Sequence, residues 1–199
     1  MTTEEYLLIE ARIKSGKEKL ESLENELQGY GLWPKITATM IGGFSIDDSA
    51  SLRIIGSILH DYYSTVENIF KAVAINIDKN SHQGDQWHKE LLEQMMLDVP
   101  GLRMPVIASE TAQKLNYYRS FRHVFRNVYG FELSFKKIKN LLELLPDTSI
   151  LLKKDLDSFI YQMRILYEVN KYELPEDLMF CQRFCIFGGF SIASTEIIH

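Results

Sequence analysis

Between residues 49 and 78 the apolar side chains recur every three to four positions. This is the spacing of one face of an α-helix, so the segment predicts a single long helix with one buried side. Asp47, Asp48 and Ser49 each offer an N-cap, and we expect the helix to end at about Asp78. A buried face of this length needs other elements to cover it. The apolar positions on that face are Ile54, Ile55, Ile58, Leu59, Tyr62, Val66, Ile69, Phe70 and Val73.

Other segments carry the same helical spacing. The expected spans are 3–27, 86–97, 109–129 and 134–171, the last with a joint at Pro146. Residues 28–47 hold several glycines and a proline and are expected to be irregular. No sustained alternation of apolar and polar residues occurs, which disfavours a sheet-based fold. The sequence therefore predicts an all-α fold, an antiparallel four-helix bundle with an additional short helix and a C-terminal extension.

Length and charge bound the class of protein. The chain has 199 residues, which fits one domain, and we divide it into a helical domain, 1–171, and an extension of unknown role, 172–199. Its 46% hydrophobic content excludes disorder of the whole chain, and its net charge of −5 excludes a protein that coats nucleic acid by bulk charge. The pentapeptide Gly-Gly-Phe-Ser-Ile at 42–46 recurs at 188–192, which is too short to define a repeat architecture.

The chain shows no sign of membrane insertion, secretion or metal binding. No stretch reaches the ~18 apolar residues of a membrane span, and the polar, acidic start is unlike a signal peptide. The only cysteines, Cys181 and Cys185, lack a second pair of metal ligands nearby and are expected to be small buried residues. We expect a reduced, cytoplasmic protein that needs no cofactor and no metal.

Positively charged side chains follow one stripe of the 109–129 helix. Arg119, Arg122, His123 and Arg126 advance by three, one and three positions, beside a core stripe of apolar and aromatic residues. Four such groups repel one another unless acidic partners or a polyanion neutralise them, and arginine suits phosphate because its planar fork donates two parallel hydrogen bonds. Two interpretations stay open: an RNA-binding face, or a solvated face whose arginines pair with carboxylates of a neighbouring helix.

The end of that helix resembles a known signature. Arg122-His123-Val124-Phe125-Arg126-Asn127-Val128-Tyr129 is similar to the motif of HEPN-domain ribonucleases, and especially of HepT-like toxins. That motif begins with an arginine followed by a polar residue. Three further positions separate these from a histidine, and a tyrosine follows the histidine after one more position. Asn127 stands where the family has histidine. The segments 60–63, 84–92 and 129–133 extend the resemblance, which covers roughly residues 1–170.

The resemblance implies a helical, homodimeric toxin that cleaves RNA without metal. Such a site holds the charge of the pentavalent phosphate with Arg122 and moves a proton with histidine. Asparagine cannot exchange a proton at neutral pH, so Asn127 implies weak activity unless His123 replaces it. Arg119 and Arg126 would contribute RNA binding. The alternative is a non-catalytic helical bundle that binds RNA or a partner protein in a regulatory role.

The resemblance also implies a partner. HepT-like toxins pair with an MNT-type nucleotidyltransferase antitoxin that transfers AMP to the tyrosine of the motif, here Tyr129. The plainer interpretation is that Tyr129 is the last amphipathic residue of its helix. His60 and Asp61 could support the site or could bond to each other locally. For Trp87 and His88, packing at the start of a short helix is the expected role.

Overall fold

The computed structural model describes residues 2–80, 84, 86–127 and 133–167, and at positions 126 and 127 it describes the backbone. The helices are α1 (Thr3–Gly29), α2 (Ser49–Asn76), α3 (Trp87–Gln94), α4 (Ser109–Asn127) and α5 (Phe135–Leu166). Two short strands, β1 (Met40–Ile41) and β2 (Phe44–Ser45), form the sheet seen in the described part of the chain. The prediction of an all-α fold is confirmed.

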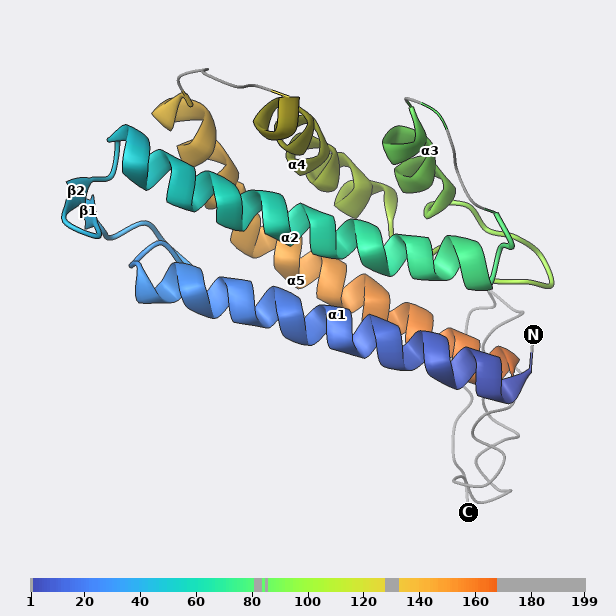
Figure 1. Ribbon diagram of the computed structural model, residues 1–199. Helices are drawn as coiled ribbons and strands as arrows, with labels where there is room; N and C mark the ends of the chain where they lie inside the picture. The colour runs from blue at the N-terminus through green and yellow to red at the C-terminus, as the bar shows by residue number, and fades with distance from the viewer. Residues whose placement is uncertain (1, 81–83, 85, 128–132, 168–199) are drawn as a thin grey trace, which may run out of the picture.

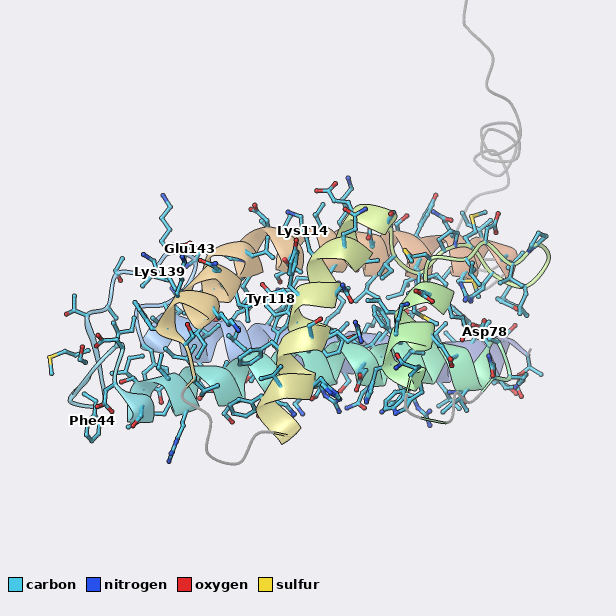
Figure 2. The ribbon with its side chains drawn as sticks, turned by 90° about the horizontal axis from the view of Figure 1, so that it is seen from above. Phe44, Asp78, Lys114, Tyr118, Lys139 and Glu143 are labelled. Carbon is cyan, nitrogen blue, oxygen red and sulfur yellow. The ribbon has the colours of Figure 1, made fainter. Side chains whose placement is uncertain are left out.

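Helix α2 is the centre of the structure. It contacts α1, α3, α4 and α5, and α1 runs along it in the opposite direction (Figure 1). Helix α4 crosses α2 steeply, as Figure 2 shows, and α3 packs against both α2 and α4. Because of this crossing, the finer prediction of a regular antiparallel four-helix bundle is not confirmed. The crossing brings the polar end of α4 beside the middle of α2.

Local chemistry explains where the long helices begin. Thr2 and Glu5 form a capping box on α1, in which each side chain bonds the other residue's backbone N–H. The Asp48 carboxylate accepts from the backbone N–H of Ala50 at 2.8 Å and caps α2, as one of the three predicted caps. Each cap satisfies N–H groups that no helical carbonyl reaches. Both helices begin at the residues expected from the sequence, Thr3 and Ser49.

The segment expected to be irregular contains a hairpin. Ile41 pairs with Phe44 across a two-residue turn, Gly42-Gly43, whose φ angles are +58° and +88°. Both central residues of a type I′ turn need positive φ, which glycine adopts without steric cost. The first copy of the repeated pentapeptide is therefore a hairpin turn, while the copy at 188–192 lies outside the described residues, as do Cys181, Cys185 and the extension 172–199.

Helix α5 runs through Pro146 without a break. Its first part is set at an angle to the rest (Figure 2), in line with the predicted joint, because proline removes one helical N–H donor and crowds the preceding turn. The joined helix still packs on α1, α2 and α4.

Buried tyrosines tie the helices together through hydrogen bonds. The Tyr6 hydroxyl donates to the Ile160 carbonyl at 2.9 Å, and the Tyr118 hydroxyl donates to the Leu141 carbonyl at 2.8 Å. Both tyrosines are buried, and Figure 2 shows Tyr118 midway along α4.

Within the described residues, no helix is long and apolar enough to cross a membrane.

Candidate functional site

Arg122 lies on the side of α4 that faces α2 and α3. Its side chain is 12% exposed, and it makes three polar contacts with those two helices. Nε donates to the Ser64 hydroxyl at 3.2 Å, Nη1 lies 3.3 Å from Nε2 of His88, and Nη2 lies 3.3 Å from Oε2 of Glu67. Arg122 follows the buried Leu115 by two helical turns and the buried Tyr118 by one, which explains its burial.

Glu67 joins the groups around Arg122. Its side chain is 2% exposed and lies on the buried side of α2. It accepts from Nδ1 of His88, and its Oε2 lies 4.0 Å from the Lys71 ammonium nitrogen. We call Ser64, Glu67, Lys71, His88 and Arg122 the Glu67 cluster. A carboxylate this deeply buried is stable as an ion only with such partners.

The contacts of His88 fix its tautomer. Guanidinium N–H groups only donate, so Nε2 of His88 accepts from Arg122 and carries no proton. The ring proton is then on Nδ1, which donates to Glu67. Burial lowers the pKa of His88 below its ordinary value, and the cations of Arg122 and Lys71 lower it as well, while Glu67 raises it. His88 is therefore a neutral imidazole at neutral pH, with its basic nitrogen toward Arg122.

Two other arginines of this molecule show what a purely structural pair looks like. Arg103 reaches Asp78 with two nitrogens at 2.6 and 2.8 Å, and Arg164 reaches Glu10 with two nitrogens at 2.8 and 2.5 Å. Both pairs are bidentate and short, as strong charge-assisted bonds are. Arg122 instead divides its donors among three residues at 3.2–3.3 Å. It is held more loosely than Arg103 and Arg164.

The predicted basic stripe does not lie on one exposed surface. Arg119 is half-buried, and its Nε donates to the Asn116 side chain at 2.9 Å, whereas His123 is exposed. Arg122 turns inward as described above. The backbones of positions 126 and 127 form the last described turn of α4, and Tyr129 lies outside the described residues. The structure therefore brings Arg122 together with α2 and α3, and places Arg119 and His123 further round the helix.

The other candidate residues, His60 with Asp61 and Trp87, have different surroundings. His60 bonds Asp61 through Nδ1 at 3.1 Å, while its buried Nε2 has no hydrogen-bond partner in the described part of the chain. This is the local arrangement that the sequence left open. Trp87 packs on the core, with the Lys71 ammonium 4.3 Å from its ring centroid. Trp87 thus packs as expected and also holds a cation of the Glu67 cluster.

Sequence reasoning missed Ser64, Glu67 and Lys71 and gave His88 only a packing role. The available signal was Glu67, which borders the apolar face of its helix next to Val66 and three positions before Phe70, where a buried carboxylate needs partners. No group of three or more His, Cys, Asp and Glu side chains that could hold a metal occurs among the described residues.

A cationic groove of about 450 Å³ lies between α1 and α2, beside the cluster. Lys71 lines it together with Arg12 and Lys19, and no carboxylate is among its lining residues. Lys71 therefore belongs both to the groove and to the Glu67 cluster. Such a surface suits an anionic ligand.

Comparison with known proteins gave one family. A family model described as HepT-like protein matches residues 54–163, which is more than half of the chain. The match begins within α2 and ends within α5, so it contains Glu67, His88 and Arg122. No curated protein and no solved structure matches the chain.

Proposed function

The chain belongs to the HepT-like protein family, and from that premise we propose that it is a HEPN-type toxin of a toxin–antitoxin system, a metal-independent endoribonuclease that acts in the cytoplasm. One observation supports the reaction: Arg122, the motif arginine, is held by long contacts beside a histidine with an unprotonated ring nitrogen. A phosphate could draw such a guanidinium into two shorter bonds.

The reaction needs a cation whose attraction to the phosphate increases as negative charge develops. When the ribose 2′-hydroxyl attacks the adjacent phosphate, negative charge builds on the phosphate oxygens, and a preorganised guanidinium stabilises it. Arg122 meets this need because Ser64 and Glu67 keep it beside His88 through contacts of 3.2 and 3.3 Å, which a phosphate can replace with shorter ones. Asn127 replaces the family's histidine, so the proposed activity is weak.

RNA would reach the site along positive surface. Arg119 lies one turn before Arg122 on α4, and Lys71 links the Glu67 cluster to Arg12 and Lys19 in the groove. We propose that these cations contact phosphates at either side of the cleaved bond, despite the chain's net charge of −5.

The proposed system has two further members. We propose a homodimer in which α4 helices of two copies approach, and an MNT-type nucleotidyltransferase antitoxin that adds AMP to Tyr129. An AMP group near Arg122 and Arg126 would exclude RNA by its charge and by its volume.

A second candidate function is a non-catalytic bundle that binds RNA or a partner protein in a regulatory role. Two observations favour it: Asn127 cannot move a proton, and Arg122 already has a carboxylate partner, Glu67. Binding without cleavage is its expected behaviour. Arg122→Ala with Arg126→Ala should then weaken RNA binding and reduce the slope of log K against log salt by roughly 0.7 for each phosphate that the protein no longer neutralises.

One assay tests the proposed reaction and separates it from the alternative. Wild type, Arg122→Ala and Asn127→His are incubated with one single-stranded RNA in excess chelator. We expect slow cleavage by the wild type, faster cleavage by Asn127→His and none by Arg122→Ala. A matched control is Lys139→Ala, which removes an exposed cation of α5 that pairs with Glu143 at 3.8 Å (Figure 2). Absence of cleavage by all variants, with RNA binding retained, would favour the non-catalytic bundle.

A further inference from the structure

We propose that His88, oriented by Glu67, is the proton acceptor for RNA cleavage in this chain and does what Asn127 cannot. This inference rests on the proposed function and assigns the residue that carries its proton transfer. It places the base on α3, outside the motif of α4, and gives the buried carboxylate of α2 a role.

The geometry is that of an oriented base. A histidine acts as a base through one ring nitrogen when the other donates to a fixed carboxylate, since this sets the tautomer and stabilises the imidazolium that forms. Nδ1 of His88 donates to Glu67, whose side chain is 2% exposed and cannot move far. Nε2 is left as the acceptor, on a ring whose side chain is 20% exposed.

Arg122 connects this base to the substrate. Its Nη1 lies 3.3 Å from Nε2 of His88, so a phosphate oxygen bound by that nitrogen comes close to the base. When Arg122 turns to the phosphate, its hydrogen bond to His88 is given up and the lone pair of Nε2 becomes available. The free enzyme thus keeps the base occupied until an anion takes the arginine.

The charges of the cluster favour this exchange. Without RNA, one carboxylate, Glu67, faces two cations, Arg122 and Lys71, because His88 is neutral. The cluster therefore carries excess positive charge that a phosphate would neutralise. Had the cluster been a closed structural pair, we would expect the short bidentate bonds that Arg103 and Arg164 make.

In the proposed step, one bond to phosphorus forms and one breaks. The 2′-oxygen forms a bond to phosphorus and loses its proton to Nε2 of His88, and the bond from phosphorus to the 5′-oxygen breaks. The departing 5′-oxygen takes a proton from water, and the imidazolium later returns its own proton to water. The products are a 2′,3′-cyclic phosphate and a 5′-hydroxyl, with no metal in the step.

The groups around His88 determine how its activity responds to pH. Glu67 and Lys71 of α2 and Arg122 of α4 face the ring, and burial with the two cations holds the pKa below the ordinary value of 6.5. The base form therefore dominates at neutral pH. The rate should rise with pH through a value below 6.5 and level off above it.

Profiles of kcat/KM against pH test the assignment. We compare wild type with His88→Gln, whose amide can still bond Glu67 and Arg122, and with His88→Ala. The expected result is a loss of about 10²–10⁴ in rate for both variants and disappearance of the acidic limb. Affinity for the same RNA with a 2′-deoxyribose at the cleavage position should change less than threefold for His88→Gln. Added imidazole should restore part of the activity of His88→Ala.

A control separates this role from a structural one. Arg164→Gln disrupts an ion pair between α1 and α5, away from the cluster, and should keep the rate and the pH profile of the folded enzyme. If wild type cleaves and His88→Gln keeps both the rate and the acidic limb, this inference is overturned while the proposed function stands. If wild type does not cleave at all, the proposed function and this inference both fail.

Discussion

Gly16 lets α1 and α2 approach closely. A Cβ atom at this position would lie 2.5 Å from Cγ1 and 2.6 Å from Cδ1 of Ile69, a side chain that is itself buried. Neither distance is tolerable, so Ile69 or the helix backbone would have to move. At Gly29, near the end of the same helix, no atom lies within 4 Å of such a Cβ. Alanine substitutions at Gly16 and Gly29 therefore distinguish the effect of packing from the effect of helix propensity.

We expect Gly16→Ala to lower the free energy of unfolding by about 1–3 kcal/mol, because overpacking outweighs a propensity gain of up to about 1 kcal/mol. Gly29→Ala should change stability by less than about 1 kcal/mol. Urea unfolding measures both. Combining Gly16→Ala with Ile69→Ala should cost less than the sum of the single changes, and simple additivity would contradict the contact.

His88 should also make folding sensitive to pH. Since its pKa is lower in the folded chain than the ordinary 6.5, the unfolded chain binds more protons near that pH. Its contribution to stability is full above pH 6.5 and is lost as the pH falls through the folded value. The difference in unfolding free energy between wild type and His88→Gln, from urea titrations between pH 8 and 5, should therefore shift against wild type on acidification. A constant difference would contradict this.

At the scale of elements, the sequence predicted what local spacing determines. The apolar spacing gave the five helices, and Asp48 was among the predicted caps. The hairpin was missed because its two-residue strands are too short for an alternating pattern. Arg122 was assigned to a polar stripe although it follows Tyr118 by one turn, a spacing that points it inward. The partners of Glu67 come from α3 and α4, and no local pattern reveals contacts between distant segments.

The ion pair between Glu10 of α1 and Arg164 of α5 should make the stability of the protein sensitive to acid. Hydrogen bonds from Arg164, opposed by burial, lower the pKa of Glu10 to about 2. This stabilisation is present above the ordinary pKa of 4.5 and is lost as the pH falls toward 2. At pH 7 we expect Glu10→Gln to reduce the unfolding free energy by about 1–3 kcal/mol. By pH 3 the difference from wild type should be clearly smaller, and an unchanged difference would show that the pair does not couple to protonation.

At the scale of the whole molecule, the outer side of α4 carries apolar side chains that no other described element covers. Tyr117 is 62% exposed and Val124 is 49% exposed, and seven positions separate them, so they lie on one face of α4. The opposite side of the helix packs on α2, α3 and α5. A two-fold contact uses one such patch twice, and we therefore place the proposed dimer interface on the outer face of α4.

We therefore expect a homodimer at tens of micromolar, measured by light scattering, and a monomer after Tyr117→Glu with Val124→Glu. At a two-fold interface each introduced glutamate would be buried close to the glutamates of the other copy. The resulting repulsion and desolvation make a charge on this face more disruptive than a truncation. Ile150→Glu is the matched control, because Ile150 is 65% exposed on α5 and should leave the dimer intact. Since each copy carries its own Glu67 cluster, the monomeric variant should still bind RNA, but it should neutralise fewer phosphates and show a shallower salt dependence. A wild-type monomer would remove the dimer from the proposal, and a dimer that survives both glutamates would move its interface to another face.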